Sequence, residues 1–282
     1  MNEIIHEGQG HRTHIKSPLM RESLMDRKVL AASDDQPVIP ILPDVHIVHL
    51  GGASILDRGK AALLPLLDEI VRCRESYKII LGVGGGARTR HTYHISLDLG
   101  IPTGGLAMVA GAVNEQNRFM VQALLAKHGG VVLHKDHYVV LPLWLASGMI
   151  PIISGMPPYH YWEPPSGLQR VPHYREDFGL FMVSEVLGAA SMIYVKDEDG
   201  LYSADPKKNA SATFIPQITA RELLDKNMPE MIVDRSVIES MLYARNTRKI
   251  QIINGLKPEL LGQALAGEPV GTIITATKEK RS

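Results

Sequence analysis

The sequence predicts an α/β protein, specifically a three-layer αβα sandwich with a mostly parallel open sheet. Short apolar segments alternate with segments of helical period along most of the chain, and glycine clusters directly follow two of the apolar segments. The chain has 282 residues, which suits one large domain of this class. Parallel sheets of this kind bind ligands at the carboxyl ends of their strands. We therefore expect the functional residues directly after the strands.

Seven apolar segments have the length of buried strands, at residues 45–50, 77–83, 131–133, 149–154, 192–195, 250–253 and 272–275. Helical spacing predicts helices in the segment after Asp57 and at residues 88–99, 105–128, 177–188, 234–247 and 258–265. Asp57 is expected to cap the first of these helices, although Pro65 argues against that helix unless it lies near the first turn. The alternation predicts helices on both faces of the sheet.

Residues 1–40 are polar, weakly periodic and end in a proline-rich stretch, so we assign them to an N-terminal arm. Residues 41–282 form the predicted domain. The sequence leaves two interpretations of the arm open: a disordered tail, or a segment that wraps around a neighbouring subunit.

Composition excludes several classes of protein. The chain has 30 basic and 30 acidic side chains and no basic block, which argues against nucleic-acid binding. Cys73 is the only cysteine, so no disulfide can form within the chain and a reducing compartment is expected. The N-terminus lacks the apolar stretch of a secretory signal, and the longest apolar run, 139–153, is interrupted and shorter than the roughly 20 residues of a membrane span. We expect a cytoplasmic protein that does not enter membranes.

Two predicted strands end in glycine clusters, and both are candidate phosphate-binding turns. Glycine lets the backbone approach an anion closely, and a following helix directs its positive end toward the same point. Arg88 and Arg90 lie at the start of the helix after the second cluster, where a guanidinium can hold phosphate oxygens. The candidate residues are Gly51, Gly52, Gly84, Gly85, Gly86 and Arg88. The spacing fits neither a Walker A loop nor a Rossmann fingerprint.

The segment K-D-E-D-G-L-Y-S-A-D-P-K at residues 196–207 follows a predicted strand and resembles the D-V-D-G-V-Y-T-A-D-P signature of the amino-acid-kinase superfamily. The resemblance extends in order over about residues 45–275 and implies the amino-acid-kinase fold. It implies nucleotide binding by Lys196, Asp197, Asp199, Gly200, Tyr202, Asp205, Pro206 and Lys207. It also implies that Asp177 lies near the transferred phosphate as a catalytic residue.

The chain departs from this superfamily at one position. Family members carry lysine two residues before the first glycine pair, and this chain carries His49. Lysine is a permanent cation, whereas neutral histidine is not. This departure puts conventional phosphoryl transfer in doubt, unless Arg88 or Lys196 compensates.

Further strings resemble the bacterial molybdenum storage proteins within this superfamily, including S-G-M-P-P-Y at 154–159 and a β-subunit-like V-K-D-E-D-G-L-Y at 195–202. The resemblance implies a hexameric cage that binds ATP with Mg²⁺ and stores molybdate or tungstate as polynuclear oxide clusters. It makes His160 the first candidate for contact with the metal oxide. His134 and His137, after a predicted strand, are further candidates.

Three functions follow from these patterns. The first is metal-oxide storage with ATP. The second is a conventional kinase of a nucleoside monophosphate such as UMP, and the third is a non-catalytic subunit of a hetero-oligomer. The sequence leaves open a homo-hexamer or a hetero-hexamer with a related subunit, molybdate or tungstate as cargo, and whether this subunit hydrolyses ATP.

Overall fold

A computed structural model describes residues 4–7, 12–15, 31, 37–164, 167 and 169–276. By contact density the chain divides into two units, Met1–Ile39 and Pro40–Ser282. In the first unit, β1 (Ile4–Glu7) and β2 (Arg12–Ile15) pair as an antiparallel hairpin. The second unit holds every candidate site residue.

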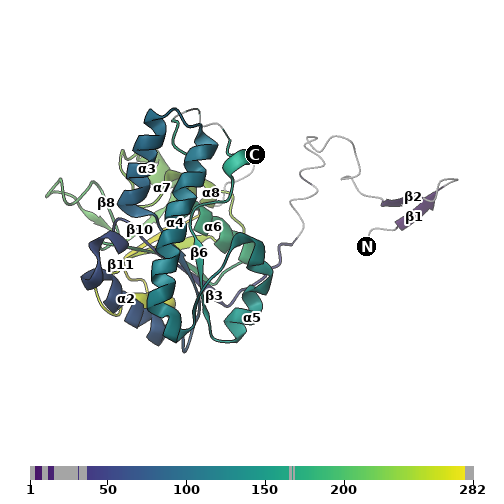
Figure 1. Ribbon diagram of the computed structural model, residues 1–282, viewed down its shortest axis with the longest axis horizontal. Coiled ribbons are helices and arrows are strands. Elements are labelled where there is room, and N and C mark those ends of the chain that lie inside the picture. Colours follow the sequence, from purple (N-terminus) through teal and green to yellow (C-terminus); the bar gives the residue numbers. More distant parts are fainter. Residues whose placement is uncertain are drawn as a thin grey trace. The chain divides into compact units, whose positions relative to one another are not determined.

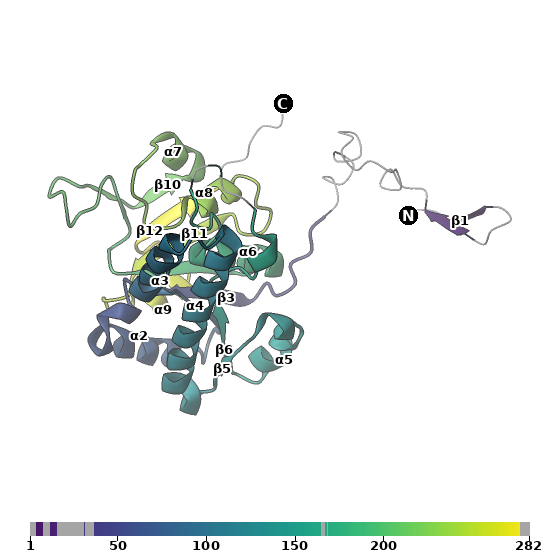
Figure 2. The ribbon, with the colours of Figure 1, turned by 45° about the horizontal axis from the view of Figure 1, so that its top comes forward.

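The second unit is built on an eight-stranded, mostly parallel sheet (Figures 1 and 2). In spatial order the strands are β10 (Gln217–Thr219), β12 (Thr272–Thr275), β11 (Lys249–Asn254), β7 (Ser191–Lys196), β3 (Val45–Leu50), β4 (Lys78–Val83), β6 (Ile150–Ser154) and β5 (Gly130–Val132). Only the β11–β12 pairing is antiparallel. The carboxyl ends of β3, β4, β6 and β7 therefore meet at one edge.

Helices cover both faces of the sheet (Figure 2). One face packs against α2 (Lys60–Cys73), α4 (Thr103–Leu125) and α9 (Leu260–Leu265), and α3 (Gly86–Asp98) packs on α4. The other face packs against α5 (Leu141–Ala146), α6 (Glu176–Leu187), α7 (Ala220–Asp225) and α8 (Arg235–Met241). This is the predicted αβα sandwich.

The alternation of side chains along β3 explains the two cores. Val45 and Ile47 lie in the core beneath α6, whereas Val48 and Leu50 lie in the core beneath α2 and α4. All four are fully buried. A strand buried on both faces is nearly continuously apolar, and residues 45–50 are apolar at every position except His46 and His49, which is why the sequence predicts a strand there.

Several short elements differ from the prediction. The helix expected at 234–247 ends at Met241, because the following backbone is held by the Glu185 carboxylate instead. Asp57 lies in a 3₁₀ turn, Leu56–Arg58, and caps α3 rather than α2 by accepting the Ala87 N–H at 2.6 Å. The helix predicted at 105–128 ends at Leu125 and continues as a 3₁₀ turn, Ala126–His128. Unpredicted elements are the 3₁₀ turns Lys135–Val140 and His160–Trp162, helices α5 and α7, the hairpin of β8 (Leu201–Tyr202) with β9 (Phe214–Ile215), and β1, β2 and β10.

Among the described residues, no helix combines the length and apolar character that crossing a membrane requires.

The Glu185 carboxylate on α6 holds the backbone that connects α8 to β11. Its carboxylate accepts the amides of Arg245 at 2.7 Å and Thr247 at 2.6 Å, and also that of Asn246. Hydrogen bonds to a charged acceptor contribute about 1.5–3 kcal/mol. We expect Glu185→Ala to lower the free energy of unfolding by about 2–3 kcal/mol in urea titrations. Glu268→Ala, at an exposed position, should change it by less than about 0.5 kcal/mol. Equal effects of the two would contradict this assignment.

Candidate functional site

A polar cavity of about 880 Å³ lies at the carboxyl ends of β3 and β7, beside the first turns of α3 and α6. Both positive and negative side chains line it. From the sequence-predicted set it brings together Gly51, Gly52, Gly86, Asp177, Lys196, Asp197, Asp205 and Lys207. A cavity of this size that combines cations with open backbone amides fits a polyphosphate.

The first glycine turn, residues 51–54, supplies those amides. Within the described residues, the N–H groups of Gly52, Ala53 and Ser54 donate to no protein acceptor. A side chain at Gly52 would collide with the backbone of Gly84 and Gly86, so this position allows two turns to pack backbone to backbone. The result is a concave surface of unpaired N–H groups at the end of β3, the kind that binds anions.

Asp177, in the first turn of α6, is the electrostatic centre of the polar cavity. Its carboxylate lies 2.9 and 3.2 Å from Lys196 Nζ and accepts the Asp234 amide at 3.0 Å. Burial alone would raise the pKa of Asp177, but the positive charge of Lys196 outweighs burial and holds this pKa far below its usual range. Asp177 is therefore a permanent anion that fixes Lys196 at the cavity wall.

His49 stands where a second cation was expected. Its Nδ1 lies 2.9 Å from Asp177 Oδ1, but the ring is not aligned for a hydrogen bond. Burial lowers the pKa of His49, and the attraction of Asp177 only partly opposes this. His49 is therefore neutral at pH 7, and Lys196 is the only permanent cation in contact with Asp177 among the described residues.

Only some residues of the segment 196–207, which resembles the family signature, line the polar cavity. Asp197 pairs with Arg58 and with Lys207 at 2.7 Å, which lowers the Asp197 pKa against the opposing effect of burial. Asp199 instead binds Asn254 and Lys257, and Tyr202 packs edge-on against Phe214. The predicted residues that do not line the cavity are Gly84, Gly85, Arg88, Asp199, Gly200, Tyr202 and Pro206.

Arg88 corrects the sequence-based interpretation. Its guanidinium contacts the side chains of Gln116 and Asn117 on α4, so it is turned away from the cavity. Arg90 lines the cavity instead. The two arginines lie two positions apart on a helix, so they face different directions. The sequence shows that Arg88 and Arg90 lie on different sides of the helix. Which of the two faces the cavity depends on the orientation of α3, which the sequence does not give.

The sequence analysis missed several cavity residues, namely Arg58, Tyr93, Arg175, Glu176 and Asp234. Arg175 and Glu176 directly precede Asp177, and this proximity was an available signal. Asp234 arrives from a distant loop and pairs with Arg175 at 2.6 Å. Nothing in the local sequence indicated that contact.

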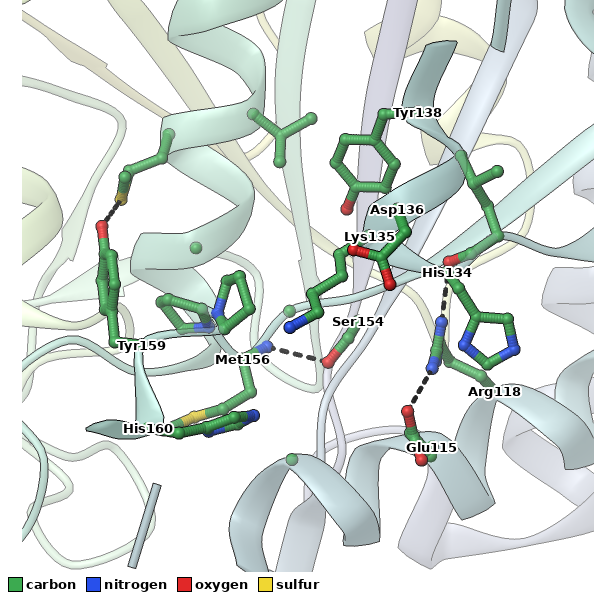
Figure 3. Close-up of a pocket in the computed structure, with 18 of the residues that line it drawn as sticks. Glu115, Arg118, His134, Lys135, Asp136, Tyr138, Ser154, Met156, Tyr159 and His160 are labelled. Atoms are coloured by element: carbon green, nitrogen blue, oxygen red, sulfur yellow. Dashed lines mark hydrogen bonds and ion pairs between the residues drawn. The ribbon is translucent and has the colours of Figure 1, made fainter. Parts of the chain in front are cut away.

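A second, mostly apolar cavity of about 580 Å³ lies on the other side of α6, between α4 and the loop that follows β6 (Figure 3). Its apolar wall includes Met108, Met156, Met182 and Val183. Its polar side chains are Glu115, Arg118, His134, Lys135, Asp136, Tyr138, Ser154, Tyr159 and His160. The two cavities thus share α6, because Glu176 and Asp177 line the polar cavity while Gly179 and Met182 line the apolar one.

His160 is held in this apolar cavity by its backbone. Its φ of 32° is unusual for a residue other than glycine, and a side chain at Gly104 on α4 would collide with its carbonyl oxygen. Nδ1 of His160 is buried and has no hydrogen-bond partner. Burial and the nearby Lys135 lower the His160 pKa, so the ring is neutral at pH 7 and able to act as a ligand.

The other two candidate histidines, His134 and His137, differ in whether they reach the apolar cavity. His134 lines the apolar cavity with His160, whereas His137 does not, although its ring lies edge-on to that of His134 at a centroid distance of 6.2 Å. Across the described ranges, no group of three or more His, Cys, Asp or Glu side chains is placed to hold a single metal ion. The apolar cavity therefore offers isolated contacts rather than a preformed mononuclear metal centre.

Comparison with known proteins identifies the relatives. The family model "Amino acid kinase family" matches residues 44–254. The chain is 44% identical over 259 residues to the molybdenum storage protein subunit beta of Azotobacter vinelandii, covering 92% of this chain and 96% of that one. It is 28% identical over 237 residues to the uridylate kinase of Methanocella arvoryzae, covering 81% of this chain and 98% of that one.

Solved structures agree on the fold. The uridylate kinase of Archaeoglobus fulgidus superposes with a TM-score of 0.63 at 18% identity, covering 82% of this chain and 99% of that chain. Together with the parallel sheet, the two glycine turns and the segment at 196–207, these matches show that the chain belongs to the amino acid kinase family.

Proposed function

We propose that this chain is a molybdenum or tungsten storage subunit that binds ATP in the polar cavity and holds polynuclear metal oxide beside it. One observation supports this function above the alternatives: a polyphosphate-type cavity and a second cavity with histidine, lysine and arginine side chains adjoin the same helix, α6. The similarity to a molybdenum storage subunit over 92% of the chain agrees with it.

The polar cavity has the groups that a nucleoside triphosphate needs. The amides of residues 52–54 suit phosphate oxygens, and Lys196 and Arg90 supply positive charge. No cluster of carboxylates among the described residues is arranged for a free cation. Mg²⁺ would therefore enter bound to the triphosphate, as it commonly does in nucleotide sites.

The apolar cavity suits an anion whose charge is spread over many oxygen atoms. Lys135 and Arg118 supply positive charge, and His160 supplies a buried neutral nitrogen. The methionine and proline wall suits the weakly hydrated surface of a large oxometallate better than that of a small, strongly hydrated anion. We propose His160 and His134 as the residues that contact the cargo.

Assembly with further subunits, in a homo- or hetero-hexamer that encloses the cargo, is part of the proposal. Helix α4 exposes four large apolar side chains, Met108, Phe119, Met120 and Leu124, each more than 40% exposed. Exposed apolar side chains gathered on one helix are common at subunit interfaces.

The alternative function is a nucleoside monophosphate kinase, which the uridylate kinase relatives favour. His49 argues against it, because a neutral imidazole replaces the lysine that the resemblance calls for next to the phosphates. An assay for UMP phosphorylation separates the two functions. Elemental analysis of protein purified from molybdate-grown cells tests storage directly, and the absence of both molybdenum and tungsten would overturn it.

Asp177→Asn tests whether this subunit uses ATP or only completes an oligomer. The change removes the charge that positions Lys196, and loss of one preorganised electrostatic group costs about a hundredfold in rate. We expect ATP-dependent molybdate loading, measured by elemental analysis over time, to slow by about that factor. Asp98→Asn, exposed at the end of α3, should load normally. Normal loading by Asp177→Asn would favour the non-catalytic alternative.

His160→Ala and His137→Ala form a matched pair for the cargo site. Of these two histidines, His160 lines the apolar cavity and His137 does not. We expect His160→Ala to weaken molybdenum retention during dialysis by about tenfold, the lower range for loss of a metal contact, and His137→Ala to leave retention unchanged. Equal retention in the two variants would remove His160 from the proposed site.

A further inference from the structure

The second glycine turn, Gly84–Ala87, already holds two carboxylates of the protein itself. Glu176 Oε1 accepts the Gly85 N–H at 2.7 Å, and Asp57 Oδ2 accepts the Ala87 N–H at 2.6 Å. These amides begin α3, which is where a helix attracts an anion. The positions that a phosphate would occupy are therefore taken by side chains from α6 and from the 3₁₀ turn after β3.

Further oxygen atoms surround the same turn. A side chain at Gly85 would collide with Thr89 Oγ1 and would lie 2.5 Å from Asn114 Oδ1 and 2.6 Å from Glu176 Oε1. At Gly86 it would collide with the Asp57 carboxylate. The space left at this turn is small and lined mostly by hydrogen-bond acceptors, which disfavours a further anion.

The charges facing Glu176 come from several elements. Asp177 on α6 and Asp234 before α8 are negative, and Lys196 on β7 is positive but bound to Asp177. Tyr93 of α3 also faces Glu176, and burial raises the pKa of its hydroxyl, so it is neutral. His49 of β3 is neutral as well. Among the described residues Glu176 has no ion-pair partner, and the Gly85 amide is its one hydrogen-bond donor.

The first glycine turn differs from the second in that its backbone amides are open. The amides of residues 52–54 are unpaired in the described part of the chain, whereas at the second turn Gly84 donates to Leu50, Gly85 to Glu176 and Ala87 to Asp57. At that turn the amide of Gly86, which lines the cavity, donates to no acceptor among the described residues. One cavity thus contains one open anion-binding turn and one turn at which carboxylates of the protein accept the amides on either side of Gly86.

We propose that Glu176 and Asp57 are specificity-determining residues whose carboxyl groups occupy the second glycine turn, so that the polar cavity accepts one polyphosphate at the first turn and excludes a phosphomonoester or other tetrahedral oxyanion from the second. This inference rests on the proposed function in one respect: an ATP analogue is used as the probe because the polar cavity is proposed to bind ATP. It gives a physical reason why a chain so similar to monophosphate kinases need not bind their acceptor.

The exclusion depends on pH if the charge of Glu176 causes it. Burial, assisted by the negative charges of Asp177 and Asp234, raises the pKa of Glu176 to about 7 against the opposing effects of the Gly85 amide and Lys196. Above pH 7 the carboxylate is ionised and repels a second anion. Below pH 7 it becomes protonated, and oxyanion binding at the second turn should take up one proton and become stronger.

The experiment uses the full chain with its first turn saturated by a non-hydrolysable ATP analogue and Mg²⁺. UMP is titrated calorimetrically at pH 8 into wild type, Glu176→Ala, Asp57→Asn and Glu230→Gln. Glu230 lines the same cavity but pairs with Lys208 at 2.7 Å, away from the turn, so it is the matched control. We expect at least tenfold tighter UMP binding by Glu176→Ala, a smaller gain by Asp57→Asn, and no gain by Glu230→Gln.

Glu176→Gln separates charge from shape, because its amide oxygen still accepts the Gly85 N–H without a negative charge. Inorganic sulfate, whose charge is constant between pH 6 and 8, is the probe. We expect sulfate binding by wild type to strengthen about tenfold from pH 8 to pH 6, and binding by Glu176→Gln to be independent of pH in this range.

Three results would overturn the proposal. Wild type could bind UMP tightly at pH 8. Glu176→Ala and Asp57→Asn could show no gain although thermal unfolding and analogue binding prove them intact. The pH dependence could survive in Glu176→Gln. If wild type failed to bind the ATP analogue, the proposed function would fall, while UMP and sulfate titrations without nucleotide would still decide the exclusion.

Discussion

The site depends on one buried carboxylate. Asp177 is 7% exposed, and burying a charge without partners costs several kcal/mol. Lys196 and the Asp234 amide offset that cost, and these contacts bring β7, α6 and the loop before α8 together beside His49 of β3. The same contacts fix the cation that faces the open amides of the first glycine turn. Fold and site thus share one electrostatic centre.

The presence of His49 instead of lysine changes the charge balance around Asp177. A lysine in its place would give Asp177 two permanent cations, whereas the neutral ring leaves Lys196 alone. The charge available to a transferred phosphoryl group is therefore smaller than the family resemblance implies. A cavity with this balance is better suited to holding a polyphosphate than to moving a phosphoryl group to a second substrate, and the carboxylates at the second glycine turn act in the same direction.

The sequence predicted the sandwich and its long elements, because continuous apolar strands and strongly periodic helices such as α4 record burial directly. It missed α7, although Thr219 and Glu222 form a readable capping box. Short elements such as β8, β9 and β10 are set by pairing partners distant in sequence. The glycine turn at 51–52 was locatable, but which of Arg88 and Arg90 faces the cavity depends on packing against α4. The contact of Asp234 with Arg175 and Asp177 left no local signal.

The wall shared by the two cavities is a single helix with little freedom. Gly179 of α6 fits so closely against the Gly155 carbonyl that even a methyl group would collide with it. Because residues of α6 line both cavities, a displacement of this helix would change the shape of the two cavities at once. The tight Gly179–Gly155 contact leaves α6 little room to shift against the loop after β6, so the wall common to the proposed nucleotide and metal-oxide sites is a stiff one.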